Sequence, residues 1–186
     1  NISSSIELNM KSKFATNFVK NVIPSMVTSY VKQYGFPIKH ITKHIQDNSI
    51  TLEELWVNFQ RKHEFNPIHD HNGMLSFVIW LSIPTSSKKQ NELPFSKNSG
   101  SKGLISNFSF VYTDILGNIK NYVYQMEKDI EGYMVMFPSR LMHQVFPFYE
   151  SEKERITISG NVGISTKQVV TKKLATKENK VSDYAS

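Results

Sequence analysis

Apolar residues recur at helical spacing near the start of the chain. Residues 12–34 carry them about one helical turn apart, which predicts helix, and Pro24 is expected to break or kink the segment. The apolar positions concerned are Phe14, Phe18, Val22, Met26 and Val27. A second helical segment is expected around residues 37–47. We therefore predict that residues 1–50 form an N-terminal helical support.

From Leu52 onwards the pattern changes to that of strands. Short runs rich in β-branched and aromatic residues are separated by turns that contain Asn, Gly or Pro. Strands are expected in ELWVNFQRKHEFNPIHDHNG, MLSFVIWLSIP, FSFVYTD, KNYVYQME, YMVMFP, HQVFPFY and RITISGNV. Helices followed by about seven or eight short strands predict a mostly β fold, a sandwich or barrel with the helices packed outside.

Two stretches interrupt or follow these strands. Residues 84–103 are rich in Ser, Lys and Gly and lack periodicity, so they are either a lid over a site or a solvated linker. Residues 166–186 form a basic, polar tail, for which we expect a solubilising role.

Composition excludes several classes of protein. Apolar residues make up 39% of the 186 residues, which suits one globular domain, and no apolar run is long enough to cross a membrane. Cysteine is absent, so any bound metal must be held by His, Asp or Glu. The net charge of +6 permits an acidic or nucleic-acid partner, but no interleaving of basic and aromatic residues supports nucleic acid.

The last strand alternates between polar and apolar positions. One face carries Arg155, Thr157, Ser159 and Asn161, and the other is apolar. Alternation alone favours an ordinary sheet whose polar face lies in water. An arginine and hydroxyls facing a barrel interior would instead form an anion site, and alternation does not decide which face is inside.

The stretch His69-Asp70-His71 is a candidate metal site. Residues two apart on a strand point to the same side, so His69 and His71 can converge on one ion while Asp70 points away. His143, the only downstream histidine, is the candidate third ligand. Arg155 offers a planar fork that suits a carboxylate, with the Thr157 hydroxyl as support.

These motifs occur in an order that points to a known family. They read Trp56-Val57-Asn58, His69-Asp70-His71-Asn72-Gly73, Leu75-Ser76, Phe137-Pro138-Ser139, His143, Pro147 and Arg155-Ile156-Thr157-Ile158-Ser159-Gly160-Asn161. Over about residues 52–163 the chain thereby resembles the 2-oxoglutarate- and Fe(II)-dependent oxygenases, most closely a bacterial and phage branch with unassigned substrates.

The resemblance implies a fold, a chemistry and a location. The fold would be a double-stranded β-helix (jelly-roll, cupin-like) over residues 51–165. The protein would be a dioxygenase that uses Fe(II), 2-oxoglutarate and O2 to hydroxylate a substrate in the cytoplasm of a bacterium or a phage-infected host cell. Arg155 and Thr157 would pair with the far carboxylate of 2-oxoglutarate. Weaker candidates for the pocket are Asn58, Ser76, Trp80 and Asn161, and for Trp80 plain core packing is favoured.

The chain departs from the wider superfamily at the second ligand. A carboxylate is usual there, whereas this chain has His71. We expect His69, His71 and His143 to be the ligands, with Asp70 as an alternative if a bulge turns it inward. Two other readings stay open: a cupin-like metal- or carboxylate-binding protein without turnover, and an interaction module that works through its basic tail. The substrate, a protein side chain or a small molecule, and the oligomeric state are not specified by the sequence.

Overall fold

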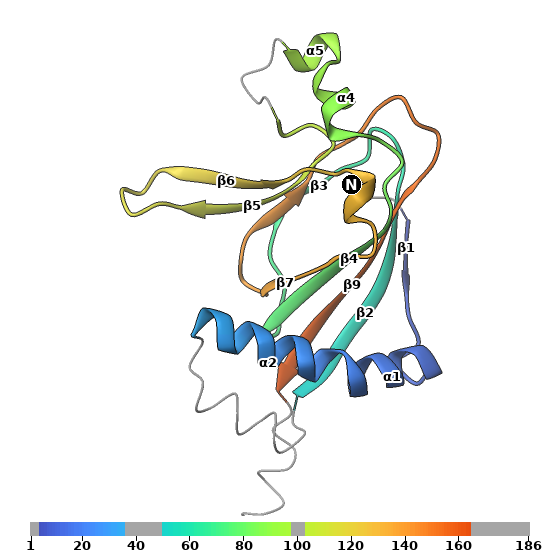
Figure 1. The fold of residues 1–186 in the computed structure, drawn as a ribbon, viewed down its shortest axis with the longest axis vertical. Coiled ribbons are helices and arrows are strands. Elements are labelled where there is room, and N and C mark those ends of the chain that lie inside the picture. The colour runs from blue at the N-terminus through green and yellow to red at the C-terminus, as the bar shows by residue number, and fades with distance from the viewer. Residues whose placement is uncertain (1–3, 36–49, 98–102, 165–186) are drawn as a thin grey trace, which may run out of the picture.

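Two antiparallel sheets face each other in the computed structural model, which describes residues 4–35, 50–97 and 103–164 (Figure 1). The larger sheet is built from β1 (Ser4–Glu7), β2 (Ile50–Gln60), β4 (Leu75–Ser82), β7 (Met134–Pro138) and β9 (Arg155–Ile164), in the order β1-β2-β9-β4-β7. The smaller is built from β3 (Asn66–His69), β5 (Phe108–Thr113), β6 (Ile119–Tyr124) and β8 (His143–Val145), in the order β3-β8-β5-β6. From β2 onwards, successive strands of the chain thus supply both sheets of a double-stranded β-helix, and the predicted fold class is confirmed.

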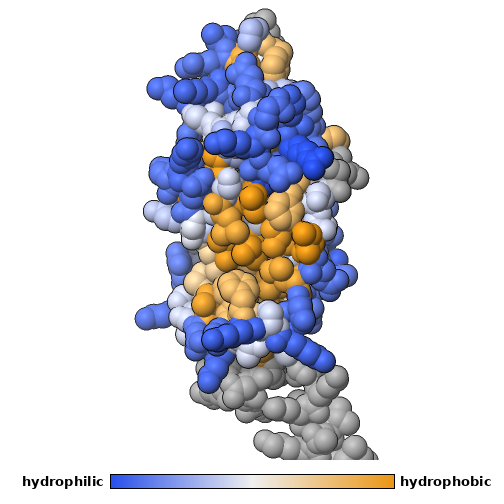
Figure 2. Space-filling view, turned by 90° about the vertical axis from the view of Figure 1, so that its right-hand side faces the viewer, coloured by the Kyte–Doolittle hydropathy of each residue, from blue (hydrophilic) through white to orange (hydrophobic). Residues whose placement is uncertain are grey.

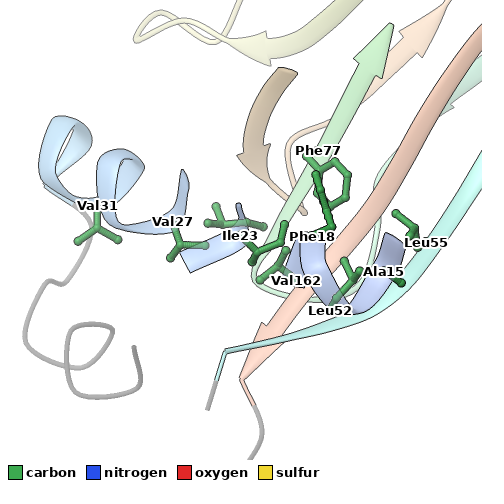
Figure 3. Close-up of a cluster of buried hydrophobic side chains, with 10 residues drawn as sticks. Ala15, Phe18, Ile23, Val27, Val31, Leu52, Leu55, Phe77 and Val162 are labelled. Carbon is green, nitrogen blue, oxygen red and sulfur yellow. The ribbon is translucent and has the colours of Figure 1, made fainter. Parts of the chain in front are cut away.

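The two N-terminal helices lie across the larger sheet (Figures 1 and 3). Helix α1 (Lys13–Asn21) begins at Ser12, whose hydroxyl accepts a hydrogen bond from the backbone of Ala15. Helix α2 (Ile23–Tyr34) has Pro24 in its first turn, where a proline costs no hydrogen bond. The predicted break at this proline is therefore the start of a second helix.

A first hydrophobic core lies between these helices and the sheet (Figure 3). Phe18 of α1 packs on Phe77 of β4, with ring centroids 5.5 Å apart. Val162 of β9 is completely buried in the same cluster. The apolar face of β9 is therefore the face covered by the helices.

The polar face of β9 consequently points to the interior between the sheets. Arg155 and Asn161 are each only 2% exposed. The interpretation favoured by alternation alone, a polar face in water, is wrong. A second hydrophobic core, which includes Trp80, Phe108 and Phe137, fills part of this interior.

The stretch of residues 84–103 is partly helical where it is described. It contains α4 (Ser87–Asn91) and α5 (Pro94–Lys97). The side chain of Gln90 is buried, and it donates to the backbone oxygen of Tyr149 at 2.9 Å and accepts from its nitrogen at 2.7 Å. The solvated-linker interpretation is wrong for this part, while a role as a lid stays a prediction.

Other features differ from expectation or fall outside the described residues. Strand β1 was not predicted; it pairs with β2 in a region expected to be helical. A single turn of 3-10 helix, η1 (Lys128–Ile130), precedes β7. The helical candidate at 37–47 and the tail at 166–186 lie outside the described residues, and the proposed boundaries after residues 50 and 165 stay predictions.

The side of the molecule that carries β1 and α1 has a hydrophobic band between hydrophilic ends (Figure 2). Ile6 of β1 is 55% exposed and Phe14 of α1 is 50% exposed. Within the described part of the chain, no helix combines the length and apolar character that crossing a membrane requires.

Candidate metal and carboxylate site

A cavity of about 270 Å³ lies between the two sheets. Its lining includes Trp56, Asn58, Gln60, His69, His71, His143, Arg155 and Thr157. Residues predicted separately, from the His-x-His motif and from the Arg-x-Thr strand, therefore share one cavity. Its remaining walls are largely apolar, with Trp80 and Phe108 among them.

Three histidines converge at one end of this cavity. His69 and His143 stand directly opposite each other on the paired strands β3 and β8, and their ring centroids are 4.2 Å apart. His71 follows β3, and its backbone N–H donates to the carbonyl of Ser139 at 2.9 Å. One nitrogen from each ring lies within 4.8 Å of the other two.

The second nitrogen of two of these rings is occupied. Nδ1 of His69 lies 2.7 Å from the carbonyl oxygen of Pro67, and Nδ1 of His143 lies 2.9 Å from that of Leu141. A carbonyl only accepts, so each Nδ1 carries the proton and Nε2 carries the lone pair. In His69 this Nε2 lies 3.3 Å from the amide nitrogen of Asn66. Backbone carbonyls orient metal-binding histidines in this way in many proteins.

Burial keeps His143 and His71 uncharged. It lowers the pKa of His143 to about 4 and also lowers the pKa of His71, on which the neighbouring His69 acts in the same direction. Both rings are therefore neutral at neutral pH, the form that binds metal. Three imidazoles with nitrogens this close fit a divalent transition metal and leave coordination positions open.

Asp70 lies outside this cluster. Its carboxylate pairs with Arg140 at 3.2 Å, on the surface, in agreement with the expectation that it points away from its two histidine neighbours. Pairing between β3 and β8 is irregular between Asn66 and His69, but this irregularity does not turn Asp70 inward. The structure thus brings together the three predicted histidines and leaves the alternative ligand out.

Arg155 lies in the same cavity without a carboxylate partner among the described residues. Its Nη1 donates to Gln60 at 3.1 Å, and its Nη2 lies 2.5 Å from the carbonyl oxygen and 2.9 Å from the hydroxyl of Ser106. Its buried Nε has no hydrogen-bond partner in the described structure. Burial lowers the pKa of Arg155 to about 9. An uncompensated buried cation with an unused donor fits an anionic ligand.

The strand register places the arginine and the histidines at opposite ends of the cavity. Across β2 and β9, Gln60 pairs with Arg155, Asn58 with Thr157 and Trp56 with Ser159. Trp56 packs against His71, with centroids 5.5 Å apart. Arg155 and Ser159 are four residues apart, or about 13 Å of strand. The register thus separates the guanidinium from the histidine end along the cavity.

Asn58 and Thr157 lie between these ends and touch each other. The amide of Asn58 donates to the Thr157 hydroxyl at 3.3 Å, and both side chains line the cavity. The structure thus brings both predicted residues into the cavity, beside Arg155.

Ser76 lines the cavity, as predicted, whereas Asn161 does not. Asn161 accepts from Ser76 at 2.7 Å and donates to Glu54, and it does not line the cavity. Ser76 does line it and also bonds Ser139, whose carbonyl holds the backbone of His71. This network supports the histidine end from behind.

Trp80 lines the cavity and packs in the second core, as favoured for it. It is 2% exposed, and its ring lies 5.8 Å from that of Phe108.

Two residues of the site, Gln60 and Ser106, were not predicted. Gln60 continues the alternation of Trp56 and Asn58 along β2, a signal that could have found it; Ser106 has no comparable signal.

A family model and several solved structures resemble this chain. The model, described as "Putative 2OG-Fe(II) oxygenase", matches residues 54–161, more than half of the chain. A Pseudomonas putida prolyl-4-hydroxylase structure is 13% identical with a TM-score of 0.47, over 84% of this chain and 66% of that one. A Burkholderia pseudomallei oxidoreductase of the 2OG-Fe(II) oxygenase family is 14% identical with a TM-score of 0.42, over 61% and 45%.

A cupin domain from Bordetella pertussis is 13% identical with a TM-score of 0.31, over 63% of this chain and 92% of that one. The chain spans under half of the length of the Burkholderia protein and just under two thirds of the Pseudomonas protein. No curated protein matches the sequence.

Proposed function

Because this chain belongs to the 2OG-Fe(II) oxygenase family, we propose that it is an Fe(II)- and 2-oxoglutarate-dependent dioxygenase that hydroxylates its substrate. One observation carries the proposal: three converging histidines and an arginine without an anionic partner lie at opposite ends of one cavity. The three histidines leave coordination positions open, and the arginine lacks an anionic partner among the described residues. A 2-oxo acid with a second carboxylate complements both.

His69, His71 and His143 would hold the metal. One ring nitrogen from each histidine is close enough to the other two for all three to bind one ion, and His69 and His143 are oriented by backbone carbonyls. Imidazole ligands carry no negative charge, so Fe(II) would keep its full positive charge for the oxo-acid end of 2-oxoglutarate.

Arg155 would bind the far carboxylate of 2-oxoglutarate, with the Thr157 hydroxyl beside it. Pairing with an anion would offset the cost of a buried, unpaired guanidinium. The bound iron and co-substrates supply the oxidation, in which O2 and 2-oxoglutarate yield succinate and CO2 while one oxygen atom enters a substrate C–H bond. The chain contributes orientation and an apolar wall, which includes Trp80 and Phe108, that excludes water.

The size of the cavity supports a modest reacting group. About 270 Å³ must accept the co-substrate and the part of the substrate that reacts. A protein side chain or a small molecule meets this limit, and we propose that the enzyme acts on one of these in the cytoplasm.

The third histidine supports one alternative. With Asp70 paired to Arg140, no carboxylate joins the cluster in the described residues. A cupin-like protein that binds metal and a carboxylate without turnover would use the same residues.

Formation of succinate separates the two functions. Purified protein is incubated aerobically with Fe(II) and 2-oxoglutarate, and succinate is measured for the wild type, His143→Ala and His63→Ala. His63 is an exposed histidine outside the cluster and serves as the matched control. We expect iron-dependent succinate in the wild type and His63→Ala, and none above background in His143→Ala. Wild-type protein that binds iron but forms no succinate would support binding without turnover.

A further inference from the structure

In the described part of the chain, every group that contacts the buried guanidinium of Arg155 by a hydrogen bond is neutral. The amide oxygen of Gln60 accepts from Nη1, and the carbonyl and hydroxyl of Ser106 accept from Nη2. The ring of Phe148 lies 5.1 Å from the central carbon. These contacts fix the position of the cation without cancelling its charge.

Gln60 can present only its oxygen to Arg155. Its Nε2 donates to the carbonyl oxygens of Glu64 at 2.6 Å and Phe146 at 3.2 Å. A carbonyl oxygen accepts hydrogen bonds from the amide nitrogen and not from the amide oxygen. These two backbone carbonyls therefore fix which way the Gln60 amide faces. The side chain is 2% exposed and stands opposite Arg155 in the register of β2 and β9. Its position is therefore fixed before any ligand binds.

Ser106 approaches Arg155 through an unusual backbone conformation. Its φ is +67°, in the left-handed region that non-glycine residues seldom adopt, and the residue is completely buried. Its N–H donates to Pro147 at 2.9 Å, and its hydroxyl contacts that of Thr85 at 3.1 Å. The result is that two oxygens of one residue meet the same nitrogen, Nη2 of Arg155. Surrounding bonds thus maintain a strained residue at the anion site.

The remaining donors of Arg155 are few and defined. A guanidinium carries five N–H hydrogens, of which Gln60 takes one and Ser106 takes two. One hydrogen on Nε and one on Nη1 are left. A carboxylate must come to these hydrogens, because the guanidinium cannot turn without breaking its other bonds.

We propose that Gln60 and Ser106 are positioning residues that fix Arg155 at a set distance from the three histidines, so that the cavity selects 2-oxo diacids by chain length. The inference rests on the proposed function and deepens it. With both ends of the cavity fixed, a diacid one carbon shorter or longer than 2-oxoglutarate cannot satisfy both. If the hydrogen bonds from Gln60 or Ser106 are removed, the guanidinium can shift to meet the carboxylate of a shorter or longer diacid.

Calorimetric titration of the Fe(II)-loaded protein under anaerobic conditions tests this without turnover. The probes are oxaloacetate, 2-oxoglutarate and 2-oxoadipate, which differ by one carbon each. We expect the wild type to prefer 2-oxoglutarate. Gln60→Met removes one hydrogen bond to a charged donor and should weaken the binding of 2-oxoglutarate by about 10-fold or more. The same variant should also reduce the preference for 2-oxoglutarate over oxaloacetate and 2-oxoadipate, while the affinity for Fe(II) is unchanged.

Two further variants separate position from charge. Ser106→Gly keeps the backbone carbonyl and tolerates the positive φ but loses the hydroxyl, so its effect should follow that of Gln60→Met and be smaller. Gln60→Glu places a carboxylate against Arg155, which should weaken all three diacids together and leave the order of preference unchanged. Gln144→Met is the matched control, because Gln144 bonds Ser109 and Asn121 outside the cavity and should not affect binding.

The outcomes distinguish the two proposals. A wild type that binds no 2-oxoglutarate would overturn the proposed function and this inference with it. A wild type that binds it, with Gln60→Met and Ser106→Gly variants that keep the same affinity and length preference, would overturn only the positioning role. Variants that lose thermal stability but keep the preference would likewise reduce Gln60 and Ser106 to structural residues.

Discussion

Replacing Arg155 with methionine removes the buried guanidinium and keeps an unbranched side chain. The three histidines are untouched, so metal binding should persist in the variant. The proposed carboxylate of 2-oxoglutarate would lose its only charged partner in the described part of the cavity lining. The variant should therefore separate binding of the co-substrate from binding of the metal.

The expected loss can be worked from the burial of the pair. Arg155 is 2% exposed, so its partner would be a desolvated carboxylate. Removing one member of such a pair costs about 3 kcal/mol, which is about 150-fold in Kd. A wild-type protein at about 100 times Kd gains about 2.7 kcal/mol, or roughly 5–10 °C in Tm. At the same concentration the variant should gain only about 0.3 kcal/mol, roughly 1 °C.

The assay is thermal unfolding of the Mn(II)-loaded protein with and without 2-oxoglutarate. Arg140→Met is the matched control, since Arg140 is exposed and pairs with Asp70 and Asn72 on the surface. It should keep the wild-type shift. Equal shifts in Arg155→Met and in the wild type would refute the assignment of the carboxylate to Arg155.

Three further changes test other parts of the account. Because burial lowers the pKa of His143 to about 4, the unfolded chain binds this proton at a higher pH than the folded protein does. Protonation of His143 should therefore lower the unfolding free energy of the metal-free protein by about 2 kcal/mol between pH 7 and 4.5, measured by urea unfolding. A His143→Gln variant whose unfolding free energy falls equally over this pH range would contradict this. Asp70→Asn should leave Co(II) affinity unchanged and alter the unfolding free energy by less than about 1 kcal/mol, since the carboxylate pairs with exposed Arg140; a large loss of affinity would place Asp70 on the metal. Gly160→Ala should destabilise by about 1–3 kcal/mol in the same urea assay, since a Cβ would lie 2.6 Å from both the backbone oxygen of Glu54 and the ring of Phe77. An unchanged midpoint would contradict this and show that the strand and the ring both yield at little cost.

Local sequence pattern predicted the helix at the start of the chain, most of the later strands and the direction of two histidines. The spacing of Phe14 and Phe18 predicted helix, and the two-residue period placed His69 and His71 on one side with Asp70 on the other. These features depend on neighbours in the chain, where side-chain direction follows from backbone geometry. The third histidine, His143, was found as the only downstream candidate, and β8 brings it opposite His69.

Features that depend on distant parts of the chain were missed or misjudged. The alternation in β9 gave two faces, but only the packing of α1 and α2 on one of them shows that Arg155 lies inside. Gln60 joins the site through the register of β2 with β9, 95 residues away along the chain. Ser106 depends on a left-handed backbone conformation held by Pro147, which no local signal marked.

The stretch at 84–103 shows the same limit. Its composition suggested a lid or a solvated linker, yet Gln90 is fixed by two hydrogen bonds to the backbone of Tyr149. Composition describes what a segment can do in water, whereas its structure here depends on partners elsewhere in the fold.

The most direct test of the central claim is an anaerobic titration of the protein with Fe(II) and then 2-oxoglutarate, followed by visible absorption. We expect a metal-to-oxo-acid charge-transfer band in the wild type that is absent in His143→Ala and that requires far more 2-oxoglutarate in Arg155→Met. Protein that binds iron but shows no band at saturating 2-oxoglutarate would contradict the claim that one cavity holds both the metal and the co-substrate.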